Sequence, residues 1–143
     1  MTVLTHMAVG GALGSLVDGR AAPFALGLGS HIVLDVIPHY EFEKMWVEAL
    51  IVTGALGALL ALGRAESAVF WGALGGVLPD IENLLWKQGI LPGRWKMFPG
   101  HNRRLRRFVP HGRPLPVRHA WWQVVMAAAG VFVAARALIR TAG

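Results

Sequence analysis

Histidine and aspartate recur at four-residue intervals in one apolar stretch of the sequence, as His31, Asp35 and His39. Residues four apart lie on the same face of an α-helix, so a helix over this stretch presents two imidazoles and a carboxylate in one stripe. The chain contains no cysteine. Nitrogen and oxygen ligands without sulfur suit a divalent cation, with Zn²⁺ preferred and Mn²⁺ or Fe²⁺ as alternatives.

Further residues of these types stand near the ends of other apolar segments. Asp80 and Glu82 follow Pro79, and His6 lies close to the start of the chain. Five imidazoles and at least two carboxylates exceed one tetrahedral site and would fit two ions, as in hydrolases whose metals clamp a phosphoryl group. We expect Glu82 to be the catalytic base that takes a proton from a bound water. The predicted metal ligands are His6, His31, Asp35, His39, Asp80, His101 and His111.

Each of these residues also has a purely structural interpretation. His6 could hydrogen-bond a backbone carbonyl, and His31 and Asp35 could neutralise each other. Glu41 and Glu82 could be solvated or pair with basic side chains, and histidines in a loop are often polar surface. An ionisable side chain inside a membrane-spanning helix costs roughly 2.5–3.5 kcal/mol on insertion scales, so in either interpretation it needs a partner or a function.

The elements that must position these residues are strongly apolar. Hydrophobic residues make up 55% of the 143 residues and charged residues 15%, whereas soluble domains carry about 25% charged residues. Segments free of Lys and Arg cover 1–19, 21–43, 45–63, 65–86 and 119–135, and each holds about the 17–25 mainly apolar residues that a spanning helix needs. We therefore predict an all-α, polytopic membrane helix bundle in a single domain (1–143), with about five spanning helices at 2–17, 21–38, 45–63, 66–86 and 119–139.

The stretch 87–118 carries nine of the 14 Lys and Arg residues and no acidic residue. The positive-inside rule places this basic loop in the cytoplasm, and counting spans back places the N-terminus there too, in an integral inner (plasma) membrane protein. A basic segment beside a membrane meets anionic lipid headgroups more often than nucleic acid, so we expect membrane lipid as the partner.

A short internal similarity supports this layout. Val36-Ile-Pro-His-Tyr-Glu41 resembles Val77-Leu-Pro-Asp-Ile-Glu82, 41 residues apart, at four of six positions: three are identical and one pairs Ile with Leu. Helices one–two and three–four are therefore predicted to be parallel repeats, which would place His39 and Asp80 on the same membrane face. The spacings Gly10-x-x-x-Gly14 and Gly72-x-x-x-Gly76 predict close helix packing.

The motifs resemble the LexA-regulated, membrane-bound metal-dependent hydrolases, the YdjM-like family of small polytopic proteins. The resemblance covers residues 6 to 111, and it rests on His6, His31-x-x-x-Asp35 with Pro38-His39, Leu78-Pro-Asp80-Ile-Glu82, and His101. It implies a hydrolase with His6, His31, Asp35, His39, Asp80 and His101 as metal ligands. The His-x-x-x-Asp element is also similar to a ligand pair of zinc-dependent phospholipase C.

The sequence departs from the family pattern in two places. Glu82 stands where the family has aspartate, which keeps a carboxylate. The loop motif His-Arg-Gly followed by Thr-His-Ser is not reproduced, because Asn102 and Arg103 follow His101, and His111 is left as a substitute for the second histidine.

These observations lead to one expected function and two alternatives. We expect a metal-dependent hydrolase at the cytoplasmic membrane surface that acts on a phospholipid or another lipid-linked phosphoester. The alternatives are a metal-binding component of a membrane transporter and a non-catalytic scaffold that binds anionic lipid. Guanidinium groups pair well with phosphate, so the residues predicted to bind the substrate's anionic group are Arg103, Arg104, Arg106 and Arg107.

Overall fold

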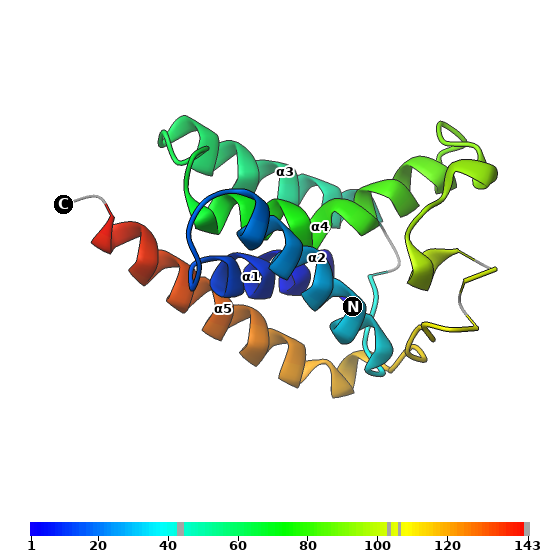
Figure 1. Cartoon of the computed structure of the whole chain (residues 1–143). Helices are drawn as coiled ribbons and strands as arrows, with labels where there is room; N and C mark the ends of the chain where they lie inside the picture. The colour runs from blue at the N-terminus through cyan, green and yellow to red at the C-terminus, as the bar shows by residue number, and fades with distance from the viewer. Residues whose placement is uncertain (43–44, 103, 106, 142–143) are drawn as a thin grey trace.

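Five α-helices and three short 3-10 turns make up the regular structure that the computed structural model describes, over residues 1–42, 45–102, 104–105 and 107–141 (Figure 1). No strand occurs in these segments beyond a single bridge between His39 and Pro114. The prediction of an all-α fold with five helices is confirmed. The helices are α1 (Val3–Gly14), α2 (Ala21–Val36), α3 (Met45–Ala61), α4 (Ala68–Lys87) and α5 (Trp121–Arg140), and the 3-10 turns are η1 (Gly93–Trp95), η2 (Pro99–His101) and η3 (Val117–His119).

Helix α1 occupies the centre of the bundle, with α2, α4 and α5 packed around it and α3 at the edge against α1 and α4 (Figure 1). Glycine makes this arrangement possible. A Cβ atom on Gly10 would lie 2.5 Å from the carbonyl oxygen of Gly72, and one on Gly72 would collide with the carbonyl oxygen of Gly10. The two backbones are thus in direct contact, as the small-residue spacings predict.

The ends of the helices differ slightly from the predicted bounds. Helix α2 ends at Val36, two residues before Pro38. This end is expected, because a proline disfavours the helical conformation of the residue before it. Helix α4 instead continues through Pro79 to Lys87. A proline inside a helix removes one N–H from the ladder, and its ring meets the carbonyl group of the residue four positions earlier. The helix nevertheless extends past Pro79 and carries Asp80 and Glu82.

The residues that follow α4 fold back over one end of the bundle, and we call their described part (91–102, 104–105 and 107–115) the returning segment. The backbone N–H groups of Met97 and Phe98 donate to the Glu82 carboxylate at 2.5 and 3.0 Å. Further along, the N–H of Gly112 donates to the carbonyl oxygen of Asp35 at 2.6 Å, and the N–H of His39 donates to that of Arg113 at 3.2 Å. These contacts carry His101 and His111 to the end of α2.

Helix α5 is long and apolar enough to cross a membrane, with 20 residues and a mean hydropathy of 1.7 in its best window. Only 22% of that window is buried inside the chain, unlike the core helix of a soluble protein. Helices α1, α2 and α3 are apolar but shorter; the 12 residues of α1 extend about 18 Å at ~1.5 Å per residue. The polytopic arrangement with five spans and its orientation stay predictions.

Replacing Gly72 by alanine tests the contact between α1 and α4. The added methyl group meets the backbone of Gly10 and Gly14, and overpacking of this kind typically destabilises by about 1–3 kcal/mol. Gly57→Ala is the matched control, because its Cβ would meet nothing within 4 Å and alanine favours a helix over glycine by about 1 kcal/mol.

We expect Gly72→Ala to lower the unfolding midpoint, followed by circular dichroism in detergent micelles, and Gly57→Ala to leave it unchanged or raise it. Equal midpoints for the two variants would contradict direct backbone contact at Gly72.

Candidate metal centre

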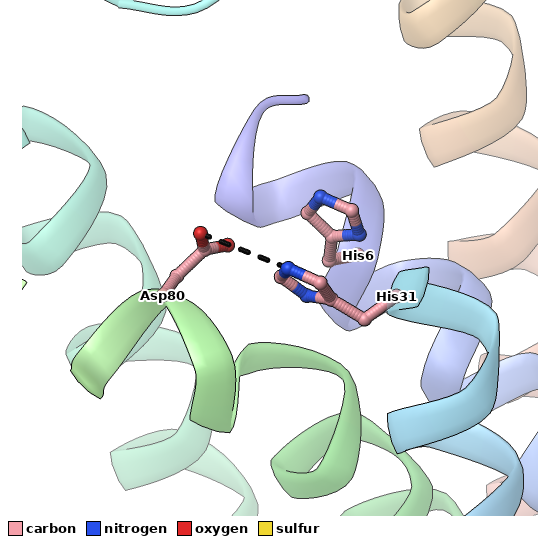
Figure 2. A group of neighbouring side chains, drawn as sticks. All are labelled: His6, His31 and Asp80. Atoms are coloured by element: carbon pink, nitrogen blue, oxygen red, sulfur yellow. Dashed lines mark ion pairs between the residues drawn. The ribbon is translucent and has the colours of Figure 1, made fainter. Parts of the chain in front are cut away.

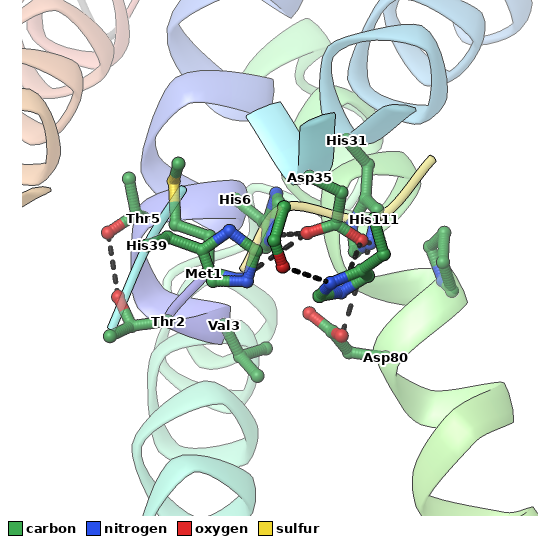
Figure 3. A network of polar contacts seen from close by, with 12 residues as sticks. Met1, Thr2, Val3, Thr5, His6, His31, Asp35, His39, Asp80 and His111 are labelled. Atoms are coloured by element: carbon green, nitrogen blue, oxygen red, sulfur yellow. Dashed lines mark hydrogen bonds and ion pairs between the residues drawn. The ribbon is translucent and has the colours of Figure 1, made fainter. Parts of the chain in front are cut away.

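The carboxylate of Asp35, on the last turn of α2, lies at the centre of a cluster of imidazoles (Figure 3). His6 Nε2, from α1, lies 3.0 Å from Asp35 Oδ1. Three imidazoles face Asp35 Oδ2 through their Nε2 atoms: His31 at 3.1 Å, His101 at 3.2 Å and His111 at 3.5 Å. Side chains from α1, α2 and the returning segment therefore meet at one carboxylate.

Asp80 and His39 extend the cluster on two sides. Asp80 Oδ1, from α4, lies 4.0 Å from His31 Nε2, and the His31 ring stacks on the His6 ring with centroids 3.7 Å apart (Figure 2). The His39 ring lies 4.8 Å from the His111 ring. Three overlapping groups have ligand atoms within 4.8 Å of one another: His6 with His31 and Asp80, His31 with Asp35 and His101, and Asp35 with His39 and His111.

All seven predicted ligands thus gather in one place, and buried groups of His and Asp here could hold a metal ion. His6, His31 and His39 are fully buried and Asp35 is 2% exposed. Burial of ionisable groups at this density is tolerated only when they are paired or share a cation. The identity of the ion and the role of each residue as a ligand stay predictions.

Hydrogen bonds to the backbone determine which ring nitrogen carries the proton in four of the five imidazoles. Each of the four has its Nδ1 atom against a carbonyl oxygen, which can only accept, so Nδ1 is the protonated atom and Nε2 of the neutral ring carries a lone pair. The pairs are His31 with Gly76 (2.7 Å), His39 with Ile37 (2.7 Å), His101 with Pro79 (3.2 Å) and His111 with Gly112 (3.0 Å).

The Nε2 lone pairs then face carboxylate oxygens, which also only accept. Contact between two acceptors is repulsive unless a cation, either an added proton or a metal ion, lies between them. His31 Nε2, Asp35 Oδ2 and Asp80 Oδ2 are buried and have no hydrogen-bond partner in the described structure. A histidine that donates one ring N–H to a backbone carbonyl and directs the other nitrogen to a shared centre is the usual arrangement at a metal site.

The structural interpretation that His6 simply bonds a carbonyl is not what the geometry shows. Its Nε2 atom contacts Asp35, and its Nδ1 atom is buried without a partner among the described residues. His31 and Asp35 do lie together, as a neutralising pair would, but three further imidazoles share the same carboxylate. The cluster is therefore larger than one ion pair.

Glu82 lies apart from this arrangement. It belongs to none of the three groups found among the described residues, and both of its oxygens accept backbone N–H groups, from Met97 and Phe98. Of the four arginines predicted to bind substrate, Arg104 and Arg107 are exposed on the returning segment. Arg103 and Arg106 lie outside the described residues.

Glu41 joins the outer edge of the cluster. Its Oε1 atom lies 3.1 Å from His39 Nε2 and 3.7 Å from His111 Nε2, and the side chain is 47% exposed. With an added proton on His39 Nε2, the hydrogen bond from His39 lowers the pKa of Glu41 to about 2. Burial lowers the pKa of His111. In the sequence, the position of Glu41 two residues after His39 is the only indication that Glu41 lies beside the cluster.

Other buried polar groups near the cluster could not be found from sequence patterns. Glu48, in the first turn of α3, accepts the N–H of Val3 at 2.9 Å. Gln123 is 2% exposed and accepts the N–H of Thr2 at 3.2 Å, and the amino nitrogen of Met1 lies 3.3 Å from Asp35 Oδ1. Glu48 and Gln123 accept backbone N–H groups far away in sequence, and Met1 pairs with the side chain of Asp35, so no local spacing indicates these contacts.

We compared the chain with protein-family models, with curated proteins and with solved structures, and none of the three comparisons gave a match. The case for a function therefore rests on the geometry of the cluster.

Proposed function

We propose that the protein is a metal-dependent hydrolase of the inner membrane that cleaves a phosphoester of a membrane lipid at the cytoplasmic surface. The observation that carries the proposal is the set of Nε2 lone pairs from separate elements that face the carboxylate of Asp35 inside an apolar bundle. Nitrogen and oxygen donors of this kind fit Zn²⁺ first, and Mn²⁺ or Fe²⁺ next.

The chain's residues would share the work as follows. His6, His31 and Asp80 would hold one ion at the buried side of the cluster, and Asp35 with His39 and His111 a second at the outer side. A divalent ion bound there lowers the pKa of a water molecule and polarises a phosphoryl oxygen. In the hydrolysis, the water oxygen bonds to phosphorus, the bond from phosphorus to the alcohol oxygen breaks, and the alcohol leaves with a proton.

The distribution of polar and apolar side chains supports a membrane location. The outward faces of α3 and α5 carry large apolar residues that are mostly exposed, among them Leu50 (65%), Val124 (68%) and Phe132 (62%). The fully buried positions, in contrast, include His6, Asp35 and Gln123. Extended exposed apolar faces indicate a membrane or a partner surface. The exposed arginines of the returning segment suit anionic headgroups.

A transporter would need a polar path through the bundle. A cavity of about 560 Å³ does lie at the end of the helices opposite the candidate metal centre, and its lining includes Asp18, Arg20 and Glu66. Between the two ends, however, the backbones of α1 and α4 meet at Gly10 and Gly72. This contact leaves no room for a polar path between α1 and α4 at that level, which supports the hydrolase over the transporter.

Metal analysis of purified protein tests the first half of the proposal. We expect the wild type in detergent to retain zinc, manganese or iron in a fixed ratio to protein, and Asp35→Asn to lose it, because the shared anionic ligand is gone. His119→Gln is the matched control, since His119 is exposed and only accepts a hydrogen bond from Arg118. Elemental analysis by mass spectrometry is the measurement, and a metal-free wild type would contradict the proposal.

Lipid hydrolysis tests the second half. We expect the protein in phosphatidylglycerol and phosphatidic acid nanodiscs to release a water-soluble product that chelator abolishes and added Zn²⁺ restores. Asp35→Asn should show the rate of the chelated sample, while His119→Gln should match the wild type. Mass spectrometry of lipids and headgroups is the readout. Metal-loaded protein that leaves both lipids intact would remove these lipids as substrates, and metal flux across vesicles would favour the transporter.

Glu82→Gln separates two roles for Glu82. Loss of a general base typically lowers kcat by about 10²–10⁴-fold. Because both carboxylate oxygens already accept backbone N–H groups, we propose that Glu82 is a positioning residue that anchors the segment at Met97 and Phe98. We then expect kcat to fall by less than about tenfold and thermal stability to fall with it. A fall of a hundredfold or more at unchanged stability would restore Glu82 as the base.

A further inference from the structure

A cavity of about 850 Å³ lies between α2, α4 and residues 91–99 of the returning segment. Its volume is within the range of about 300–1,000 Å³ that is usual for ligand sites. Its wall is almost wholly apolar, with Leu28 and Ile32 from α2, Leu85 from α4, and Leu91 and Phe98 from the returning segment. We call this cavity the apolar chamber.

The apolar chamber shares a wall with the candidate metal centre. The ring of Phe98, which lines the chamber, stands edge-on to the His31 ring with centroids 5.0 Å apart. Pro79 also lines the chamber, while its carbonyl oxygen accepts the Nδ1–H of His101. A ligand in the chamber is therefore separated from the metal centre by single side chains rather than by a helix.

Charged groups at the chamber are few. Both oxygens of Glu82, which is part of the lining, accept the N–H groups of Met97 and Phe98. Arg94 is also part of the lining and is exposed. A guanidinium group pairs well with phosphate, so Arg94 favours a ligand that carries an anionic group.

The apolar lining also selects the kind of occupant. A peptide segment would bring backbone N–H and C=O groups into a wall with almost no partners for them, and each unsatisfied group costs about 1–3 kcal/mol on the scale of protein mutations. A hydrocarbon chain has no such groups. Leu28 and Ile32 lie in an apolar helix predicted to be in the bilayer, where hydrocarbon chains are at hand.

We propose that the apolar chamber holds one acyl chain of an anionic membrane lipid, with Arg94 beside its headgroup and its phosphoryl group directed to the metal centre. The role of the lipid as substrate rests on the proposed function. The binding of the acyl chain in the chamber does not rest on the proposed function, because neither the lining nor Arg94 belongs to the cluster around Asp35. The chamber would then determine which phosphoester the metal centre meets.

Photolabelling of the full chain tests the proposal. The probe is a non-hydrolysable analogue of phosphatidylglycerol, with methylene groups in place of the two ester oxygens on phosphorus and a diazirine in the middle of one acyl chain. It is diluted into phosphatidylcholine nanodiscs that hold the protein as purified. We expect labelled residues among Leu28, Ile32 and Leu85, identified by mass spectrometry, and competition by unlabelled phosphatidylglycerol. Ile32→Trp fills the chamber and should lower this labelling roughly tenfold, equivalent to about 1.4 kcal/mol of binding.

Val33→Trp is the matched control, because Val33 is the next residue on α2 and is 65% exposed outside the chamber; its labelling should equal that of the wild type. If Ile32→Trp does not fold, judged by gel filtration and circular dichroism, Leu91→Trp fills the chamber from the opposite wall. Arg94→Gln should weaken labelling by the anionic probe but not by a phosphatidylcholine probe.

Two results would overturn the proposal. One is labelling that does not saturate and falls equally on outward residues such as Val33 and Phe132. The other is chamber labelling that stays at the wild-type level in Ile32→Trp and Leu91→Trp. Because the probe is not hydrolysable, labelling does not require hydrolysis. Chamber labelling without any hydrolysis would remove the proposed function and keep the chamber as a lipid site; hydrolysis without chamber labelling would do the reverse.

Discussion

Four imidazoles share one buried carboxylate, and the rest of the structure depends on how that contact is made favourable. Asp35 receives His6 on one oxygen and His31, His101 and His111 on the other. The backbone holds the Nδ1 protons of three of these rings, so acceptors face acceptors at the centre. Asp35 and the rings of His6 and His31 are buried, which leaves little water to separate them. The buried groups could hold a metal ion, and a cation there would turn this repulsion into an interaction that holds α1, α2, α4 and the returning segment together.

The helix packing serves the same centre. Because Gly10 and Gly72 bring the backbones of α1 and α4 into contact, His6 and Asp80 approach from two helices without long side chains to bridge them. A Cβ atom on Gly76 would collide with the carbonyl oxygen of His6, and the carbonyl oxygen of Gly76 accepts the Nδ1–H of His31. Glu82 anchors the returning segment, which brings His101 and His111 to the cluster and forms one wall of the apolar chamber. One carboxylate outside the cluster therefore shapes both sites.

Much of this could be predicted from the sequence, for physical reasons that are local. The four-residue spacing of His31 and Asp35 gives their common face, and alternation of spans places His6, His39 and Asp80 at one end of any five-helix bundle. The proton positions could not be predicted, because they depend on carbonyls such as that of Gly76, 45 residues from His31. The contacts of Glu82, Glu48 and Gln123 depend likewise on backbone groups brought near by tertiary folding. The chamber arises only when the proline- and glycine-rich stretch turns back, for which no periodicity exists.

X-ray absorption spectroscopy at the zinc edge, on zinc-loaded protein in detergent, tests the central claim most directly. We expect a first shell of nitrogen and oxygen only, with Zn–N distances of about 2.0–2.1 Å, and outer-shell scattering from more than one imidazole ring per zinc ion on average. A shell of oxygen atoms without imidazole scattering would contradict the claim, because zinc would then be bound at the surface and the buried histidines would owe their arrangement to protons alone.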